Sequence, residues 1–212
     1  MDRRQALTLI RAASVVLVLA AIVAQAITLA NAKAFDWTRF FAYFTIQSNL
    51  VGVAVLGWLV VRHGQARSRN VELARGAAAV YLTVTFLVVI VLLGGVDVQL
   101  QLAWVDFVLH KLFPVIVVLD WIVDPPRTAI RYRDALVWLV YPIVWTALTI
   151  IRGAYDGWYP YPFLDPVQSG GYGAVVVTVI GVTIGFLVIA AAMVAIAVAR
   201  RRGMHDDSAM SA

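Results

Sequence analysis

Residues 40–61 read FFAYFTIQSNLVGVAVLGWLVV, a run of 22 residues without a charged side chain. An α-helix rises 1.5 Å per residue, so about 20 such residues cross the roughly 30 Å hydrocarbon core of a membrane. The run therefore has the length of one transmembrane helix, which we expect to cover residues 39–61. Its first half carries an unusual polar cluster, in the sequence TIQSN at 45–49.

Five further stretches have the same apolar character, and together the six account for most of the chain. The expected spans are 7–30, 39–61, 76–95, 104–123, 135–152 and 173–199, followed by a polar tail at 200–212. The composition agrees, because 62% of the residues are hydrophobic and only 14% are charged, against about 25% charged residues in soluble domains. The sequence predicts an all-α, polytopic membrane protein, with a single six-helix transmembrane domain over 1–212.

The distribution of cations predicts the orientation of this bundle. If the N-terminus is cytoplasmic, thirteen of the seventeen lysines and arginines fall in cytoplasmic segments or helix ends. The other four are Lys33, Arg39, Lys111 and Arg152. Because cytoplasmic loops of membrane proteins are enriched in Lys and Arg, we expect both termini in the cytoplasm of a multi-pass protein of the cell membrane.

The same composition excludes several classes of function. The chain has no cysteine, which removes disulfides, iron–sulfur clusters and a cysteine nucleophile. Its net charge of +5 is carried by residues at helix ends, so we expect no nucleic-acid partner. A haem-binding reductase needs two axial ligands, commonly histidines, and only one histidine lies in an apolar run. We expect no metal and no cofactor, and the sequence predicts no oligomeric state.

That histidine is His110, in the segment WVDFVLHKLFP at 104–114. Ionisable side chains inside membrane helices are costly and usually functional. Asp106 lies one helical turn before His110 on the same face, and Pro114 removes the backbone donor that would pair with the His110 carbonyl. The segment predicts a reactive site in the outer leaflet.

A second polar group lies at a similar depth, in the helix expected over 39–61. The i, i+3, i+4, i+7 spacing gives this helix one face made of Thr45, Ser48, Asn49 and Gly52. Gln47 points away from that face. A glycine there lets a neighbouring helix approach closely, so this face should pack against another helix.

The two groups together predict a hydrolytic site. A hydroxyl becomes nucleophilic when a neighbouring base takes its proton, and imidazole is the usual base near neutral pH. We therefore expect Thr45 to be the nucleophile and His110 the base, with Asp106 orienting the ring. Ser48 and Asn49 would donate hydrogen bonds to a developing oxyanion.

Supporting residues are expected from the helix over 135–152, which runs outward. Tyr141, Trp145 and Arg152 align on one of its faces and reach the outer level. Arg152, or Lys111, would bind a carboxylate, while Tyr141 and Trp145 support the site. The substrate that fits all of these groups is an acyl ester in the outer leaflet with one charged end.

Each group also has a simpler interpretation. Thr, Ser and Asn often form hydrogen bonds between membrane helices, and Asp106 could cap its helix. Arg152 and Lys111 could extend to the interface. Gly181 and Gly185 form a small-xxx-small motif that predicts helix packing only. The long external loop at 152–173, RGAYDGWYPYPFLDPVQSGGYG, is either an aromatic belt or a lid over the site.

The arrangement of a threonine in FFAYFTIQSNL and a histidine in WVDFVLHKLFP, within six helices, resembles the androgen-induced protein family and its bacterial six-pass relatives. Animal members of that family are intramembrane threonine hydrolases of fatty acid esters of hydroxy fatty acids. The resemblance implies that Thr45 is the nucleophile, that His110 is its partner and that the ligand is a membrane lipid ester.

Two other functions fit part of the pattern. Asp106, His110, Asp120 and Asp124 lie along one helix, and such chains of acids and histidines are typical of proton-coupled carriers. Asp120 and Asp124 could instead pair with cytoplasmic arginines near the end of the helix. A non-catalytic membrane scaffold would use the polar cluster for packing alone.

Overall fold

The computed structural model describes residues 2–93 and 102–210, with side chains described as far as residue 201. Every regular element in this part of the chain is helical. The long helices are α1 (Arg3–Asn31), α3 (Phe44–Val61), α4 (Arg69–Val91), α8 (Val137–Asp156) and α10 (Tyr172–Met210). The shorter ones are α2 (Trp37–Phe40), α5 (Ala103–Phe107), the π-helix η1 (Val108–Leu112), α6 (Phe113–Val123), α7 (Tyr132–Ala135), the 3-10 helix η2 (Pro162–Leu164) and α9 (Pro166–Ser169).

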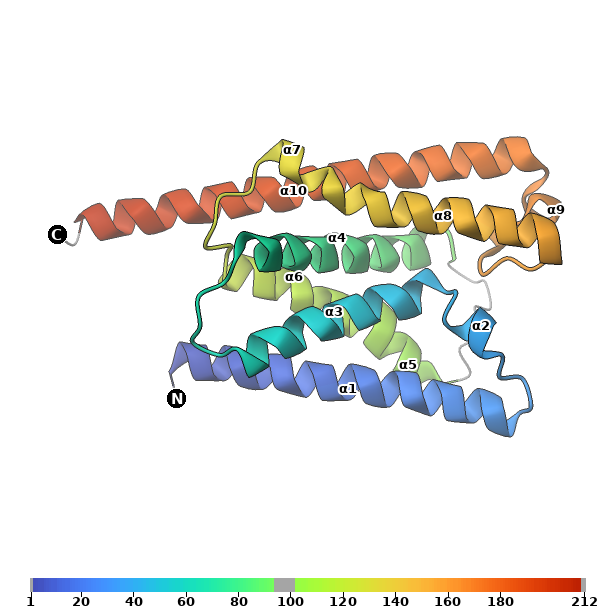
Figure 1. Ribbon diagram of the computed structural model, residues 1–212, viewed down its shortest axis with the longest axis horizontal. Helices are drawn as coiled ribbons and strands as arrows, with labels where there is room; N and C mark the ends of the chain where they lie inside the picture. Colours follow the sequence, from blue (N-terminus) through green and yellow to red (C-terminus); the bar gives the residue numbers. More distant parts are fainter. Residues whose placement is uncertain (1, 94–101, 211–212) are drawn as a thin grey trace.

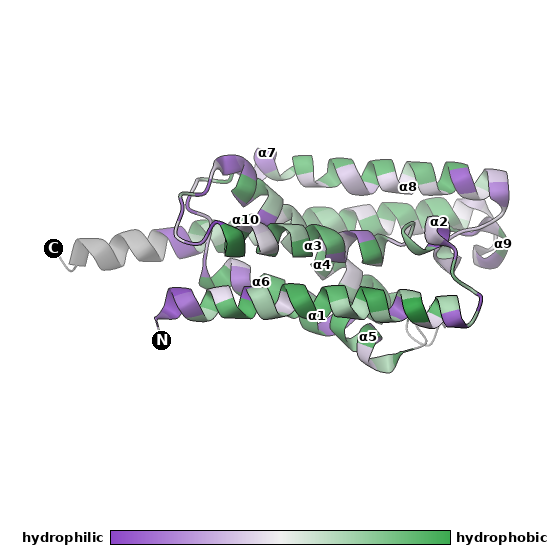
Figure 2. Ribbon diagram, turned by 60° about the horizontal axis from the view of Figure 1, so that its bottom comes forward, coloured by the Kyte–Doolittle hydropathy of each residue, from purple (hydrophilic) through white to green (hydrophobic). Residues whose placement is uncertain are grey.

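Five helical segments in the described part are long and apolar enough to cross a membrane. They are Arg3–Asn31, Phe44–Val61, Arg69–Val91, Tyr132–Asp156 and Tyr172–Arg201. Large apolar side chains on α1, α8 and α10 face outward, and hydrophilic residues gather toward the two ends of the bundle (Figure 2). Such faces are stable in lipid rather than in water. The prediction of an all-helical, multi-pass membrane protein is confirmed at this level.

Helix α4 forms the centre of the bundle, where it packs against α3, α6 and α10 (Figure 1). Its Ala78, Ala79 and Val80 are 0–1% exposed, and these small side chains let the neighbouring helices approach closely. Gly76 serves the same purpose, because a Cβ atom there would lie 2.1 Å from the Trp138 ring of α8. The core is therefore built around small residues on one central helix.

The helix expected over 39–61 is interrupted, and that prediction is wrong at its start. Residues 41–43 separate α2 from α3, which begins at Phe44. Side chains from elsewhere satisfy the carbonyls freed at the break, with Gln47 Nε2 donating to Phe41 O at 2.6 Å and Trp145 Nε1 donating to Ala42 O at 3.0 Å. Thr45 consequently lies in the first turn of a helix rather than in the middle of one.

The helix expected over 104–123 corresponds to α5, η1 and α6, which follow one another from Ala103 to Val123. Its middle turn is a π-helix in which the Phe113 N–H donates to Val108 O rather than to Leu109 O. The freed Leu109 carbonyl accepts a hydrogen bond from Asn49 Nδ2 at 3.2 Å. The widened turn, which contains His110, is thus held by a side chain of α3.

The remaining boundaries differ modestly from those expected. Helix α4 begins seven residues before the expected start at 76, and the expected residues 94–95 lie outside the described part. Helix α8 extends past 152 to Asp156. The tail expected at 200–212 continues α10 as far as Met210, because it contains no proline to stop a helix. Gly181 and Gly185 have no neighbouring atom within 4 Å of an added Cβ, so they do not pack against another described helix.

Three arginines and three acids form a buried ionic cluster at one end of the bundle, which we call the ionic clamp: Arg11, Arg67, Arg75, Glu72, Asp120 and Asp124. Arg11 of α1 contacts Asp120 and Asp124 at 2.7 and 2.6 Å. Arg75 of α4 contacts Asp120 at 2.9 Å. The expected pairing of Asp120 and Asp124 with arginines is therefore present, and it ties α1 and α4 to the end of α6.

Figure 1 places both ends of the described chain at this same end of the bundle, together with the α3–α4 and α6–α7 connections. The short elements α2, α5 and α9 lie at the opposite end. Most arginines outside the ionic clamp belong to the first end. The fold therefore separates a strongly basic end from an end rich in short helices and aromatic residues, and Thr45 and His110 lie toward the latter.

Candidate active site

Thr45 is the second residue of α3 and is only 6% exposed. The first backbone N–H groups of a helix have no partner within it, and the helix dipole favours negative charge at that end. The Thr45 N–H donates to the Tyr161 hydroxyl oxygen at 3.2 Å. The break at 41–43 thus gives a buried hydroxyl an electropositive setting that a continuous helix would not provide.

His110 brings its ring against this hydroxyl, as expected from the sequence. Its Nε2 lies 3.2 Å from Thr45 Oγ1 and its Nδ1 lies 2.8 Å from Asp106 Oδ1. An ionised carboxylate only accepts hydrogen bonds, so, when the ring is neutral, Asp106 favours the tautomer with the proton on Nδ1. The lone pair on Nε2 then faces Thr45, which is the orientation that a general base requires.

Asp106 does not cap its helix. The N-cap of α5 is Leu102, and Asp106 lies within the helix with no bond to its first N–H groups. Its two carboxylate oxygens contact His110 and, at 3.3 Å, Lys111 Nζ. The capping interpretation is therefore wrong, and the carboxylate connects the buried ring to a half-exposed ammonium group.

Tyr161 completes this group, although the sequence reasoning did not single it out. It follows α8 in the long loop, directly before η2, and its hydroxyl lies 3.2 Å from Thr45 Oγ1. Burial raises the pKa of the Tyr161 phenol to about 12, so the side chain is a neutral hydrogen-bond donor at any physiological pH. The aromatic loop sequence YPYPF was the available signal, since it indicated a structured segment over the site.

Ser48 and Asn49 share the buried face with Thr45, but their donors are directed to other atoms. Ser48 Oγ lies 3.1 Å from both Thr45 O and Thr85 Oγ1. Asn49 Nδ2 donates to Thr45 O at 2.8 Å and to Leu109 O. The contacts with Thr85 and Leu109 correspond to the interpretation as hydrogen bonds between helices, whereas those to Thr45 O lie within α3. None of the four reaches the Thr45 hydroxyl.

Tyr141 and Trp145 support the break before α3 rather than touch the Thr45 hydroxyl. The Tyr141 hydroxyl donates to Gln47 Oε1, while Gln47 and Trp145 donate to the two freed carbonyls. Gln47 points away from the buried face, as expected. These side chains therefore stabilise the position at which α3 begins, and through it the position of Thr45.

Arg152 reaches the outer level but is held away from the Thr45 hydroxyl. Its guanidinium donates to Thr38 O at 3.2 Å and pairs with Asp156 at 3.0 Å. Arg39 is the cation that lines a cavity shared with Thr45 and His110, and the sequence reasoning did not assign it a role in the site. Lys111 is 48% exposed and pairs with Asp106.

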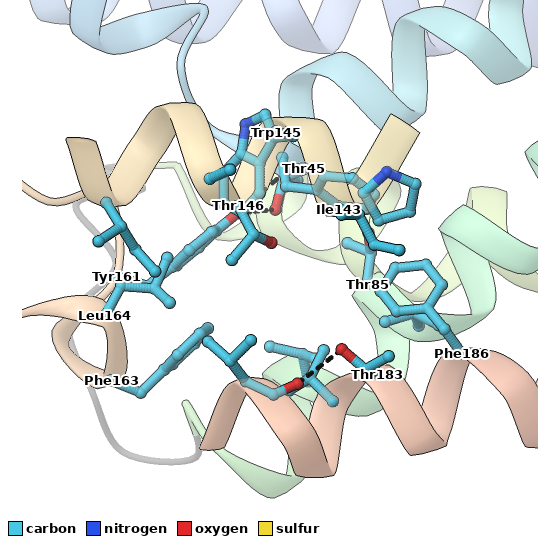
Figure 3. A pocket seen from close by; sticks show the side chains of 18 of the residues that line it. Thr45, Thr85, Ile143, Trp145, Thr146, Tyr161, Phe163, Leu164, Thr183 and Phe186 are labelled. Carbon is cyan, nitrogen blue, oxygen red and sulfur yellow. Dashed lines mark hydrogen bonds between the residues drawn. The ribbon is translucent and has the colours of Figure 1, made fainter. Parts of the chain in front are cut away.

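Thr45 lines two cavities. The larger, of about 370 Å³, lies between α3, α4, α8 and α10 and is lined almost entirely by apolar side chains. Figure 3 shows Thr45, the Tyr161 ring, Phe163 and Phe186 around this cavity. This space has the size and polarity of a pocket for a hydrocarbon chain.

The smaller cavity, of about 270 Å³, has a more polar lining. His110, Arg39 and Asp36 line it, and Thr45 and Tyr161 line both cavities. The Thr38 hydroxyl and the Arg39 N–H donate to Asp36 and hold the pKa of that carboxyl below its usual value. The catalytic candidates therefore separate an apolar compartment from a charged one.

Within the part of the chain that the structure describes, no group of three His, Asp or Glu side chains could hold a metal ion. The polar groups around Thr45 are hydroxyls, an imidazole and a carboxylate. No known protein family, curated protein or solved structure matches this chain.

Proposed function

We propose that this protein is an intramembrane hydrolase of lipid esters, with Thr45 as nucleophile and His110 as general base. The observation that carries the proposal is the chain of contacts from Asp106 through His110 to Thr45, at the N-terminal turn of a buried helix. A hydroxyl, an imidazole and a carboxylate in this order are the parts of a hydrolytic triad. The proposal agrees with the resemblance to the androgen-induced protein family.

The proposal includes six membrane spans. Residues 103–123, over α5, η1 and α6, provide about 30 Å of helix at 1.5 Å per residue and form the span that completes the set. The basic end, with both termini, faces the cytoplasm because Lys and Arg concentrate there. Thr45 and His110 then lie in the outer half of the cell membrane.

The first chemical step forms an acyl–enzyme. Thr45 Oγ1 attacks the ester carbonyl carbon while His110 Nε2 takes the hydroxyl proton, and a tetrahedral oxyanion forms. The Tyr161 hydroxyl and the N-terminal dipole of α3 stabilise that negative charge. The bond to the alcohol oxygen then breaks, His110 gives its proton to the departing oxygen, and the acyl group remains on Thr45.

The second step uses water from the polar cavity. His110 takes a proton from this water as its oxygen attacks the acyl carbon, and a second tetrahedral oxyanion forms. The bond from the acyl carbon to Thr45 Oγ1 then breaks, and the proton returns to Thr45. Asp106 stabilises the imidazolium in both steps but does not itself take the proton.

The two cavities support a specific placement of the ester. The acyl chain occupies the apolar cavity of about 370 Å³, because burial of hydrocarbon is favourable there. The alcohol part enters the polar cavity, where Arg39 can pair with a carboxylate. A fatty acid ester of a hydroxy fatty acid has this division into an apolar acyl chain and an acid-bearing alcohol.

The decisive experiment is active-site labelling of the purified full chain with a fluorophosphonate that carries an alkyl chain. We expect one adduct, located at Thr45 by mass spectrometry, and at least about 10³-fold slower labelling in His110→Ala. Thr45→Ala should not be labelled. Thr146→Ala is the matched control, since Thr146 lines the apolar cavity but has no imidazole beside it, and it should be labelled at the wild-type rate.

Hydrolysis of a fatty acid ester of a hydroxy fatty acid is measured by release of free fatty acid. It should be absent in Thr45→Ala, strongly reduced in His110→Ala and unchanged in Thr146→Ala. Folding is checked by retention of a monodisperse elution profile and an unchanged thermal transition. A well-folded wild-type protein that forms no adduct, or forms one at a residue other than Thr45, would overturn the proposal.

A further inference from the structure

A third cavity lies at the basic end of the bundle, between the start of α1, the α3–α4 connection, the end of α6 and α10. Its volume is about 770 Å³. Five of the arginines that line it have no carboxylate partner in the described part of the chain: Arg3, Arg4, Arg62, Arg127 and Arg200. Lys and Arg in the cytoplasmic loops determine the orientation of a membrane protein. That role does not require several of them to line one cavity.

The few contacts that these arginines make leave most of their hydrogen-bond donors free. Arg3 donates to Val123 O at 2.5 Å and Arg200 donates to Ile122 O at 3.1 Å. A guanidinium carries five N–H donors, so each of these contacts uses only part of the group. The free donors, and the repulsion among like charges around one cavity, make this space favourable for an anion.

The acids near the cavity do not neutralise it. Asp124 lines it but is already bound by Arg11 and Arg67 of the ionic clamp. Asp2, the N-cap of α1, is the other acid in the lining. The cavity therefore has a large excess of positive charge that no side chain of the described part compensates.

The lining of the cavity also contains the apolar residues Leu7, Leu59, Val123 and Ala199. They belong to α1, α3, α6 and α10, and α1 and α10 have outer surfaces that suit lipid. A lining that contains both guanidinium groups and aliphatic side chains matches a phosphate group joined to acyl chains. Free phosphate would use the guanidinium groups alone.

We propose that this cavity binds the phosphate headgroup of an anionic membrane lipid. Arg11 and Arg67 line the cavity and also belong to the ionic clamp, so a bound headgroup adds to the charges that hold α1, α4 and α6 together. The lipid is consequently a stabilising ligand of the basic end. This site is independent of the proposed hydrolysis at Thr45.

The test follows the thermal transition of the full chain in neutral detergent, by the fluorescence of its seven tryptophans, against added lipid. Phosphatidylglycerol should raise the midpoint saturably, whereas phosphatidylcholine with the same acyl chains should leave it nearly unchanged. Inorganic phosphate at the same and at tenfold higher concentration forms a third arm. A lipid that binds only the native state raises the midpoint by mass action.

Two double variants separate the cavity from general surface charge. Arg4→Gln with Arg62→Gln removes two cavity cations, and Arg131→Gln with Arg133→Gln removes two exposed cations that lie outside the cavity lining. We expect the first pair to weaken phosphatidylglycerol binding about tenfold and the second to change it less than twofold. Each variant is compared with its own midpoint without lipid, which corrects for any change in folding.

Three results would overturn the proposal. An equal response to both phospholipids would mean that the headgroup is not recognised. An equal loss of binding in both double variants would assign it to diffuse charge rather than to the cavity. The same stabilisation by inorganic phosphate as by phosphatidylglycerol would assign the site to free phosphate instead of a lipid.

Discussion

Tyr161 differs from the other side chains around the Thr45 hydroxyl because it comes from the loop between α8 and α10 rather than from a long helix. Its ring stacks on Phe163, with the centroids 5.2 Å apart, and its hydroxyl contacts both Oγ1 and the N–H of Thr45. It can therefore donate to an oxyanion that forms beside Thr45 without moving a helix.

Tyr161→Phe should lower ester turnover about 10²-fold, the usual effect of removing one oxyanion donor, with only a modest fall in the thermal transition, because the aromatic packing remains but the Thr45 N–H loses its acceptor. Hydrolysis and melting measurements on the same sample check this. Tyr155→Phe, at a side chain that is 94% exposed, should retain full activity. Equal activities of Tyr161→Phe and wild type would remove the phenol from the mechanism.

The raised pKa of Tyr161 also predicts how ester turnover depends on pH. Since burial raises that pKa to about 12, the phenol stays protonated throughout the pH range in which ester turnover by this protein would be assayed. Turnover by the wild-type protein should therefore show no loss between about pH 8 and 10 from ionisation of a tyrosine, whose ordinary pKa is about 10. A decline there that disappears in Tyr161→Phe would contradict this description.

At the scale of single elements, α3 contains two glycines, Gly52 and Gly57. Only Gly52 lies where a neighbouring helix approaches closely. A Cβ at Gly52 would lie 2.6 Å from Phe113 and 2.9 Å from Leu82. A Cβ at Gly57, five residues later on the same helix, would meet no atom within 4 Å. The two positions form a matched pair for testing the packing.

Gly52→Ala should destabilise the protein by about 1–3 kcal/mol, the usual cost of overpacking. Gly57→Ala should be neutral or up to about 1 kcal/mol stabilising, because Ala favours the helix. Equilibrium unfolding in mixed detergent gives both values. Labelling of Thr45 should also slow in Gly52→Ala, since Phe113 follows the turn that carries His110. Similar stabilities for the two variants would show that α3 and α6 are not in tight contact.

The elements also show which features the sequence could predict. Helical periodicity and the placement of cations predicted that Thr45 and His110 lie at a similar depth in the membrane, and in the structure Thr45 Oγ1 and His110 Nε2 are 3.2 Å apart. The break at 41–43 and the π turn at Val108–Leu112 were not predicted. Both leave carbonyls without a helical partner, and their partners are Trp145, Gln47 and Asn49.

Such compensation is a tertiary effect. Asn49 lies 60 residues from Leu109 in the chain and Trp145 lies 103 residues from Ala42. A local sequence pattern therefore cannot predict that these side chains donate to those carbonyls. The same reason explains why Tyr161 was not predicted as part of the site. Periodicity places residues on a helix face, whereas the path of a loop depends on what it packs against.

At the scale of the whole molecule, the ionic clamp determines how the basic end is held. Burial raises the pKa of Asp124, but the hydrogen bonds from Arg67 and Arg11 outweigh this effect and keep the pKa well below its usual value. The group is therefore ionised at neutral pH. A carboxylate held in this way does not accept and release protons, which disfavours a proton relay through it.

Asp124→Asn should destabilise the protein by about 2–3 kcal/mol at pH 7, somewhat less than for a fully buried partner, because this side chain is 19% exposed. The pKa of Asp124 is lower in the folded protein than in the unfolded protein, where it is near 4. Its ionised form therefore stabilises the fold above about pH 4, and this stabilisation is lost as the pH falls toward the pKa of the folded protein. The difference from wild type should therefore shrink below about pH 4.

Unfolding curves at pH 7 and pH 3 check this prediction. Asp156→Asn, which removes one partner of an exposed pair with Arg152 at the other end, should cost no more than about 1 kcal/mol. Equal effects of the two substitutions would show that the clamp is not an important source of stability. Proton flux that depends on Asp124 would favour the carrier function instead.

The meeting of two unlike cavities at Thr45 has a consequence for what happens after cleavage. The halves of a divided ester would start on opposite sides of the hydroxyl, with the hydrocarbon half toward the bilayer and the acid-bearing half toward water. The two products would then leave the site by different routes. Resynthesis would need both products to return to the site at once, so it would be slow as long as the released products stay dilute.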